Sequence, residues 1–181
     1  MAKAEILKPF ILAWEGGFVN NKNDRGGSTN RGITIATFRC VYGQSKTVTD
    51  LKALTDEQWM HVFKTLYWDK CRADEIKNQS VANLLVDFAW GSGTARAAKY
   101  IQRLVGVTQD GNIGPKTIAA INARDAKSLF TGLKAERLAF INSIVRNNTS
   151  QMVFYKGWVN RLNAIGWGTL TYGGKTRTFA N

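Results

Sequence analysis

The sequence predicts a mainly α-helical protein, and three observations support this. Apolar residues recur every three to four positions along most of the chain, as they do on one face of a helix. The strict alternation of apolar and polar residues that is typical of strands is nearly absent. Capping residues and glycines stand where the apolar periodicity starts and stops.

The composition is that of a folded chain with one domain, or with one domain and a small second lobe. Its 181 residues are 44% hydrophobic and 11% aromatic and include two prolines, which excludes an intrinsically disordered chain. No apolar run approaches the roughly 20 residues that span a bilayer, so we expect no membrane insertion. The net charge of +12 favours polyanionic partners such as nucleic acid, anionic lipid or acidic cell-wall polymers.

The first helix and the segment after it contain the candidate chemistry. Apolar residues on one face predict a helix that ends at Gly16 and Gly17, which places Glu15 at the helix end. Glycine, asparagine, aspartate and serine dominate residues 18–32, which therefore predict a loop or a short hairpin.

The remaining elements follow from caps, glycines and periodicity. Thr55 and Gln58 have the spacing of a capping box at the start of a helix. Residues 79–90 are apolar around most of the helix circumference and predict a central, buried helix. Pro115 suits the first position of a helix. We expect helices over 34–42, 55–67, 79–90, 94–105, 115–123, 128–146 and 151–165, and a hairpin over 169–179.

Two carboxylates flank the turn-rich segment. Glu15 and Asp24 are nine residues apart, and the glycines and asparagines around them allow the chain to turn back so that the two groups meet. Hydrolysis of a glycosidic bond needs two carboxyl groups across one cleft, one to donate a proton and one to activate water or attack. The pattern therefore favours a glycosidase.

The order of these residues resembles a known signature. Glu15-Gly16-Gly17-Phe18, then Asp24, Gly26-Gly27, Thr29 and Gly32-Ile33, resemble glycoside hydrolase family 108, the bacterial and phage N-acetylmuramidases. Residues 100–107, 110–120 and 154–161 are similar to the predicted peptidoglycan-binding region that accompanies this family. The resemblance implies a lysozyme-like catalytic lobe over 1–95 and a helical peptidoglycan-binding lobe over 96–181, packed together or merged into one compact domain.

The resemblance also implies roles for individual residues. Glu15 matches the catalytic acid, Asp24 the second carboxylate, and Thr29 a hydroxyl that helps to hold the attacking water. The implied reaction is cleavage between N-acetylmuramic acid and N-acetylglucosamine, without a cofactor. A separation of about 6.5–9.5 Å between the carboxyl groups would mean inversion of configuration, which we favour, and about 5–5.5 Å would mean retention.

Three further residues are candidates for substrate binding. The flat apolar rings of Trp90 and Trp158 suit stacking on sugars. Asp87 stands alone in the apolar helix, so it either contacts substrate or is a buried carboxylate that bonds a helix cap or an arginine.

His61 and the two cysteines carry no strong signal for a metal site. His61 is the only histidine and has no second ligand at a suitable spacing, so we expect no metal. Cys40 and Cys71 are expected to be thiols that pack as small hydrophobic groups, with a single disulfide left open.

Other functions remain as alternatives. A lytic transglycosylase would use one glutamate alone, and a catalytically inactive protein could bind peptidoglycan with the same fold. A nucleic-acid binder is suggested by charge alone, so we expect no specific nucleic acid as partner. The N-terminus shows no evident signal peptide, so we expect synthesis in the cytoplasm and action on the cell wall after release or export.

Overall fold

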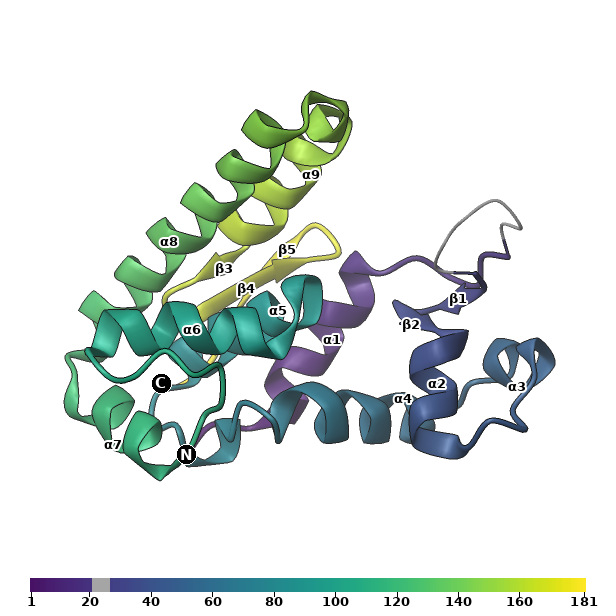
Figure 1. Ribbon diagram of the computed structural model, residues 1–181, viewed down its shortest axis with the longest axis horizontal. Helices are drawn as coiled ribbons and strands as arrows, with labels where there is room; N and C mark the ends of the chain where they lie inside the picture. Colours follow the sequence, from purple (N-terminus) through teal and green to yellow (C-terminus); the bar gives the residue numbers. More distant parts are fainter. Residues whose placement is uncertain (21–26) are drawn as a thin grey trace.

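Helices form most of the chain, which confirms the predicted fold class (Figure 1). The computed structural model describes residues 1–20 and 27–181. The described helices are α1 (Ala4–Trp14), α2 (Ile35–Tyr42), α3 (Val48–Lys52), α4 (Asp56–Phe63), α5 (Gln79–Ser92), α6 (Thr94–Val105), α7 (Pro115–Ala123), α8 (Ala126–Asn147) and α9 (Met152–Asn163), with the shorter segments η1 (Lys64–Trp68), η2 (Ala73–Glu75) and η3 (Thr149–Gln151). The described strands are β1 (Thr29–Asn30), β2 (Ile33–Thr34), β3 (Ile165–Gly166), β4 (Thr169–Tyr172) and β5 (Lys175–Thr178).

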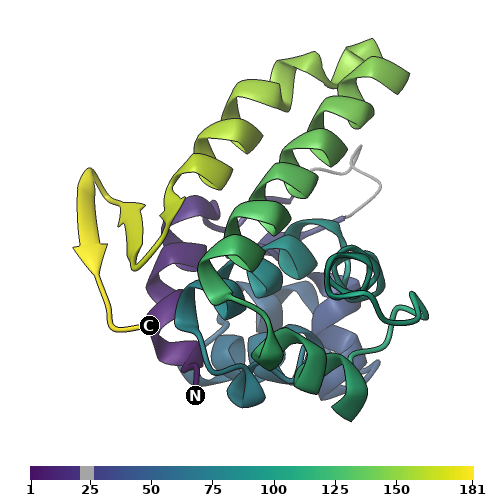
Figure 2. The same ribbon diagram turned by 90° about the vertical axis from the view of Figure 1, so that its left-hand side faces the viewer.

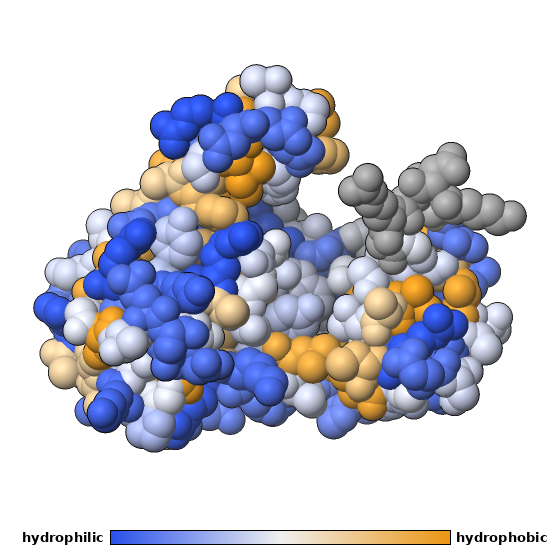
Figure 3. Space-filling model, in the orientation of Figure 1, coloured by the Kyte–Doolittle hydropathy of each residue, from blue (hydrophilic) through white to orange (hydrophobic). Residues whose placement is uncertain are grey.

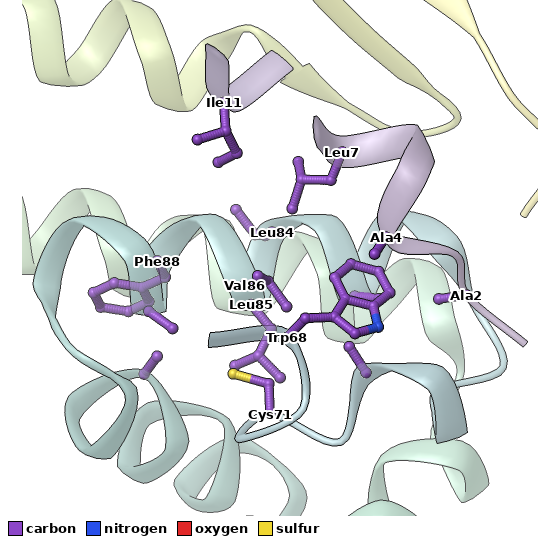
Figure 4. Packing of buried hydrophobic residues seen from close by; sticks show 14 of the residues in the cluster. Ala2, Ala4, Leu7, Ile11, Trp68, Cys71, Leu84, Leu85, Val86 and Phe88 are labelled. Atoms are coloured by element: carbon purple, nitrogen blue, oxygen red, sulfur yellow. The ribbon is translucent and has the colours of Figure 1, made fainter. Parts of the chain in front are cut away.

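Helix α5 is the central element of the core, as its composition predicts. Every residue from Gln79 to Ala89 is buried, and α5 packs against α6 and α8. Full burial of one large apolar side chain stabilises the fold by about 1.5–3 kcal/mol, so this helix contributes much of the core energy. Figure 4 shows the side chains of α5 close to those of α1 and η1, namely Leu84, Leu85, Val86 and Phe88 with Leu7, Ile11 and Trp68.

Local capping signals set the helix starts. The Thr34 hydroxyl accepts a hydrogen bond from the Thr37 amide at 3.0 Å and caps α2. Thr55 and Gln58 form the predicted capping box at the start of α4, each side chain bonded to the other residue's backbone amide. Pro115 occupies the first turn of α7. The N–H groups of the first turn have no acceptor within the helix, so the missing N–H of proline costs no hydrogen bond there.

The structure differs from the sequence predictions in three short elements. Helix α3, which begins at a capping box formed by Thr47 and Asp50, was not predicted. It is little more than one turn long, which is too short to show an apolar periodicity. Helix α4 ends at Phe63 and continues as the π-helical segment η1. Strand β3 has two residues and follows directly after α9, where a continued helix was expected.

Two small antiparallel sheets complete the fold. In the β1–β2 hairpin Asn30 lies opposite Ile33. The Asn30 side-chain Nδ2 donates to the Leu51 carbonyl at 2.9 Å, which links the hairpin to α3. The predicted C-terminal hairpin is β4–β5, with Gly173 and Gly174 at φ values of +56° and +70° in its turn. Strand β4 packs against α1.

Helices α8 and α9 form a hairpin, here called the arm (residues 126–163), whose outer end projects away from the body (Figures 1 and 2). The sequence predicts this helical pair. Met152, Val153 and Phe154 are exposed apolar residues at its outer end. A hollow separates the arm from the part of the body that carries β1 and β2 (Figure 3).

The two expected lobes share one core, because a single cluster of buried apolar side chains includes Leu7, Leu133 and Leu170. Both chain ends are tied to the start of α5. The Lys3 amide donates to Gln79 Oε1 at 2.7 Å, and the Ser80 amide donates to Asn181 Oδ1 at 3.0 Å. The termini therefore lie close together (Figure 2).

The two cysteines are both free, and they lie in different environments. Cys71 is buried in the apolar core, and burial raises the pKa of its thiol to about 12. Cys40 is exposed on α2, which corrects the expectation that both thiols pack as hydrophobic groups. The reason is that Phe38, two residues earlier, takes the buried face of that helix.

This contrast predicts different responses to the same substitution. Cys71→Ser places a hydroxyl among apolar side chains and should lower the free energy of unfolding by about 1–3 kcal/mol. Cys40→Ser is the matched control and should change it by less than about 0.5 kcal/mol. Urea unfolding of both variants measures this, and equal losses would contradict the described packing.

Candidate active site

Glu15 lies at the C-terminal end of α1, as the two glycines after it predict. Its backbone is extended, and its amide donates to the Ile11 carbonyl at 3.1 Å. The side chain leaves the core and is 19% exposed. Oε1 accepts hydrogen bonds from Trp90 Nε1 and from Arg161 Nη1, both at 2.8 Å. The carboxylate is therefore fixed by two helices distant in sequence, α5 and α9.

Gly32 brings the β1–β2 turn directly against this carboxylate. Its φ is +80°, and a Cβ atom there would lie 2.7 Å from the Trp90 ring and 2.8 Å from Glu15 Oε2. Any side chain at position 32 would thus displace the glutamate or the tryptophan. Oε1 accepts both hydrogen bonds, whereas Oε2 lies next to Gly32.

Arg161 connects Glu15 to a buried carboxylate. Its Nε and Nη2 donate to Asp87 Oδ1 at 3.1 and 2.8 Å, while its Nη1 donates to Glu15. Arg137 Nη1 lies 2.6 Å from Asp87 Oδ2 in an ion pair without the angles of a hydrogen bond. Four charged side chains from α1, α9, α5 and α8 thus alternate in sign: Glu15, Arg161, Asp87 and Arg137.

The charge state of Asp87 follows from its partners. Burial alone would raise the pKa of Asp87, but the positive charges of Arg161 and Arg137, together with the hydrogen bonds from Arg161, outweigh it and hold that pKa below its ordinary value. Asp87 is fully buried beneath the two arginines. It therefore has the contacts of a buried carboxylate paired with arginines, and it does not line the cavity itself.

A cavity of about 330 Å³ opens beside Glu15. Its walls come from the end of α1, the β1–β2 turn, the end of α5 and the inner side of the arm. The lining combines charged and apolar side chains, so the cavity can hold a ligand with both polar and apolar faces. Its lining includes Glu15, Arg137 and Arg161, and Trp90, Ile141 and Trp158.

The predicted site residues take different places around this cavity. Glu15, Trp90 and Trp158 line it. Thr29 lies in β1 opposite Thr34 and does not belong to the described lining. Asp24 lies outside the described residues.

The two tryptophans differ in their surroundings. Trp90 contacts Trp59 and Tyr67 at ring-centroid distances of 5.6 and 4.7 Å, and its N–H donates to Glu15 Oε1. Burial, and to a lesser degree the charge of Glu15, raise the pKa of Tyr67. Trp158 instead stacks on the exposed Phe154 at the outer side of the cavity.

Sequence reasoning assigned no role to Gly32, Arg137 or Arg161. Gly32 and Arg161 stand inside the segments that resemble the family, so a signal for both was present. The pairing of Arg161 with Glu15 joins positions 146 residues apart, which no local pattern reveals.

Residues 1–20 and 27–181 contain no group of three or more His, Cys, Asp or Glu side chains placed to hold a metal ion. His61 packs against Tyr42 at a ring-centroid distance of 5.8 Å. No helix in the described part of the chain is long and apolar enough to cross a membrane.

Comparisons with known proteins identify the family of this chain. The family model Glycosyl hydrolase 108 matches residues 8–93, and the model Predicted Peptidoglycan domain matches residues 96–163. The solved structure of Brucella abortus SagA is similar, with 35% sequence identity and a TM-score of 0.77 over 89% of this chain and 90% of that chain. A search of the curated proteins gave no match. With a family model over the segment that holds Glu15 and a similar structure along nearly its whole length, this lysozyme-like helical chain belongs to glycosyl hydrolase family 108.

Proposed function

We propose that this glycoside hydrolase is an N-acetylmuramidase, which cleaves peptidoglycan between N-acetylmuramic acid and N-acetylglucosamine with Glu15 as the general acid. The observation that carries the proposal is the position of Glu15 beside the cavity, held through one oxygen by Trp90 and Arg161. The family supports the reaction class, and the second matched model supports peptidoglycan as the partner.

The proposed reaction uses Glu15 Oε2 as the proton donor. Oε2 gives its proton to the oxygen that bridges the two sugars, and the bond from that oxygen to the anomeric carbon breaks through an oxocarbenium-like transition state. A water oxygen then bonds to the anomeric carbon from the opposite face. Asp24 takes the proton of that water and Thr29 helps to position it, roles that rest on the family resemblance. This arrangement inverts the configuration.

Arg161 is the positioning residue in this scheme. It occupies Oε1 and leaves Oε2 free beside Gly32, so the carboxyl group presents one defined oxygen to the glycan. The paired Asp87 and Arg137 behind it hold the guanidinium in place, because a buried arginine needs its charge and its donors satisfied. The fixed direction of the acid therefore depends also on the charged side chains behind Arg161.

Charge supports the same substrate. Peptidoglycan bears carboxylates on its peptides, and a protein of net charge +12 is attracted to such a polymer. Cleavage of this substrate requires the protein to reach the cell wall, which we propose occurs after release or export.

Glu15→Gln should abolish clearing of a peptidoglycan suspension, because the amide keeps the shape but donates no proton to the leaving oxygen. We expect a fall in rate of at least about 10²–10⁴-fold. Glu5→Gln is the matched control, since it makes the same change at an exposed position of the same helix. Turbidity measures both, and unchanged clearing by Glu15→Gln would remove Glu15 as the acid.

The released fragments distinguish hydrolysis from transglycosylation. We expect mass spectrometry of the digested wall to show muramic acid with reducing ends, and Asp24→Asn to stop their release because the water is no longer activated. Anhydro ends, with activity that survives Asp24→Asn, would show a lytic transglycosylase. Binding of peptidoglycan without any fragments would show an inactive wall-binding protein.

Asp87→Asn should destabilise the protein in a pH-dependent way. At pH 7 it leaves two arginines without their buried partner, so we expect a loss of about 3–5 kcal/mol in the free energy of unfolding. Because the pKa of Asp87 is lowered in the fold, its contribution is full above the unfolded pKa, about 3.9, and is lost as pH falls further.

Urea unfolding at pH 7, 5 and 3 tests this expectation. The difference between wild type and Asp87→Asn should be similar at pH 7 and 5 and smaller at pH 3. Asp69→Asn, at an exposed site, is the control and should change stability by less than about 0.5 kcal/mol. A loss that does not vary with pH would contradict the charged state of Asp87.

A further inference from the structure

One face of α9 leads from the cavity to the outer end of the arm. Phe154, Gly157, Trp158 and Arg161 stand at positions i, i+3, i+4 and i+7 of this helix, so they share one face. Arg161 binds Glu15 and Trp158 lines the cavity, which shows that this face looks toward the candidate active site. Phe154 continues the same face about 10 Å further along the helix from Arg161.

The aromatic side chains on this face form a continuous surface. The rings of Phe154 and Trp158 are stacked, with centroids 5.8 Å apart and planes inclined by 29°. Phe154 is 53% exposed. Its neighbour Tyr155, in contrast, turns toward α8, where its hydroxyl donates a hydrogen bond to Asn142 Oδ1. An exposed aromatic group that continues the wall of a cavity indicates a binding surface, because burial elsewhere would be more favourable for the isolated protein.

Gly157 leaves this surface open. A Cβ atom at position 157 would meet no atom within 4 Å, so nothing in the fold requires a glycine there. Glycine within a helix costs about 0.5–1 kcal/mol relative to alanine. A residue that lowers helix stability and frees space beside an aromatic pair fits the close approach of a ligand.

The charge of this region matches an anionic polymer. The sequence contains no aspartate or glutamate after Glu136, while the arm carries Arg146 and Lys156 near its outer end. A bare apolar patch would also suit a lipid surface or a second copy of the chain. This face is continuous with the cavity beside Glu15, so we favour as its ligand the glycan strand that enters the cavity, over a lipid surface or a second copy.

We propose that Phe154, Gly157 and Trp158 form an outer glycan subsite, which binds a sugar ring of the peptidoglycan strand beyond the two sugars at the cleaved bond. The C–H face of the sugar stacks on the Phe154–Trp158 pair, and Gly157 gives the strand room to pass toward Glu15. This subsite makes the enzyme act better on long strands than on short ones. The inference rests on the proposed function, since it places the reacting bond at Glu15.

Binding to intact wall tests the subsite apart from catalysis. In a Glu15→Gln background, Phe154→Ala should weaken sedimentation with purified sacculi about 3- to 10-fold, the scale of one aromatic stacking contact. Gly157→Leu should weaken it as well, because it fills the path while its open site and helical preference keep the fold intact. Val153→Ala, a more exposed apolar residue of the same arm, is the matched control and should bind as the background protein does.

Activity on two lengths of substrate separates this proposal from the muramidase assignment. With Glu15 restored, Phe154→Ala should raise KM for sacculi more than KM for a soluble glycan of two disaccharides, with a smaller change in kcat. Suppose that the wild-type protein clears sacculi, and that Phe154→Ala and Gly157→Leu bind and clear them as well as wild type does. The subsite proposal is then wrong, and the muramidase proposal is unaffected.

If wild type is inactive and Glu15→Gln makes no difference, the proposed function itself fails. If Phe154→Ala and Gly157→Leu bind sacculi normally but no longer bind anionic vesicles, the surface binds a membrane and the subsite is overturned. If they bind sacculi normally but no longer form a dimer in sedimentation analysis, the surface binds a second copy and the subsite is likewise overturned.

Discussion

The contact between Arg161 and Glu15 determines how the site is assembled. Glu15 ends α1, and the guanidinium of Arg161 comes from α9 and also binds the buried Asp87 of α5. One side chain therefore links the arm to the core and, together with Trp90, holds the carboxylate in one direction. The cavity exists between these elements, so its shape depends on this contact.

A buried ionic network is costly in desolvation, and the proposed mechanism gives this one a chemical use. Replacing such a network with apolar side chains is often neutral or stabilising, so stability alone does not explain Asp87 and Arg137. An acid catalyst, in contrast, gains from a fixed orientation of one oxygen toward the leaving group. Gly32 also restricts the orientation of the Glu15 carboxylate, because its lack of a side chain lets the β1–β2 hairpin approach Oε2 closely.

The sequence predicted the features that local chemistry decides. The bounds of α6 and α7 follow from glycine and proline signals at their ends, and the position of Glu15 follows from the glycines after it. The buried nature of α5 follows from its composition. The role of Arg161 could not be predicted, because its partners are 146 and 74 residues away and their pairing depends on tertiary packing. The exposure of Cys40 likewise depends on which face of α2 the core covers.

In the proposed mechanism, Glu15 presents to the cleaved bond the carboxyl oxygen that Arg161 does not bind. A crystal structure of the Glu15→Gln protein with a bound peptidoglycan fragment tests this most directly. We expect the glycosidic oxygen to lie within about 2.6–3.2 Å of the side-chain atom that replaces Oε2, with Arg161 still bonded to the other side-chain atom. A glycan bound in the cavity with its bridging oxygens distant from position 15, or bound on another face of the molecule, would contradict it.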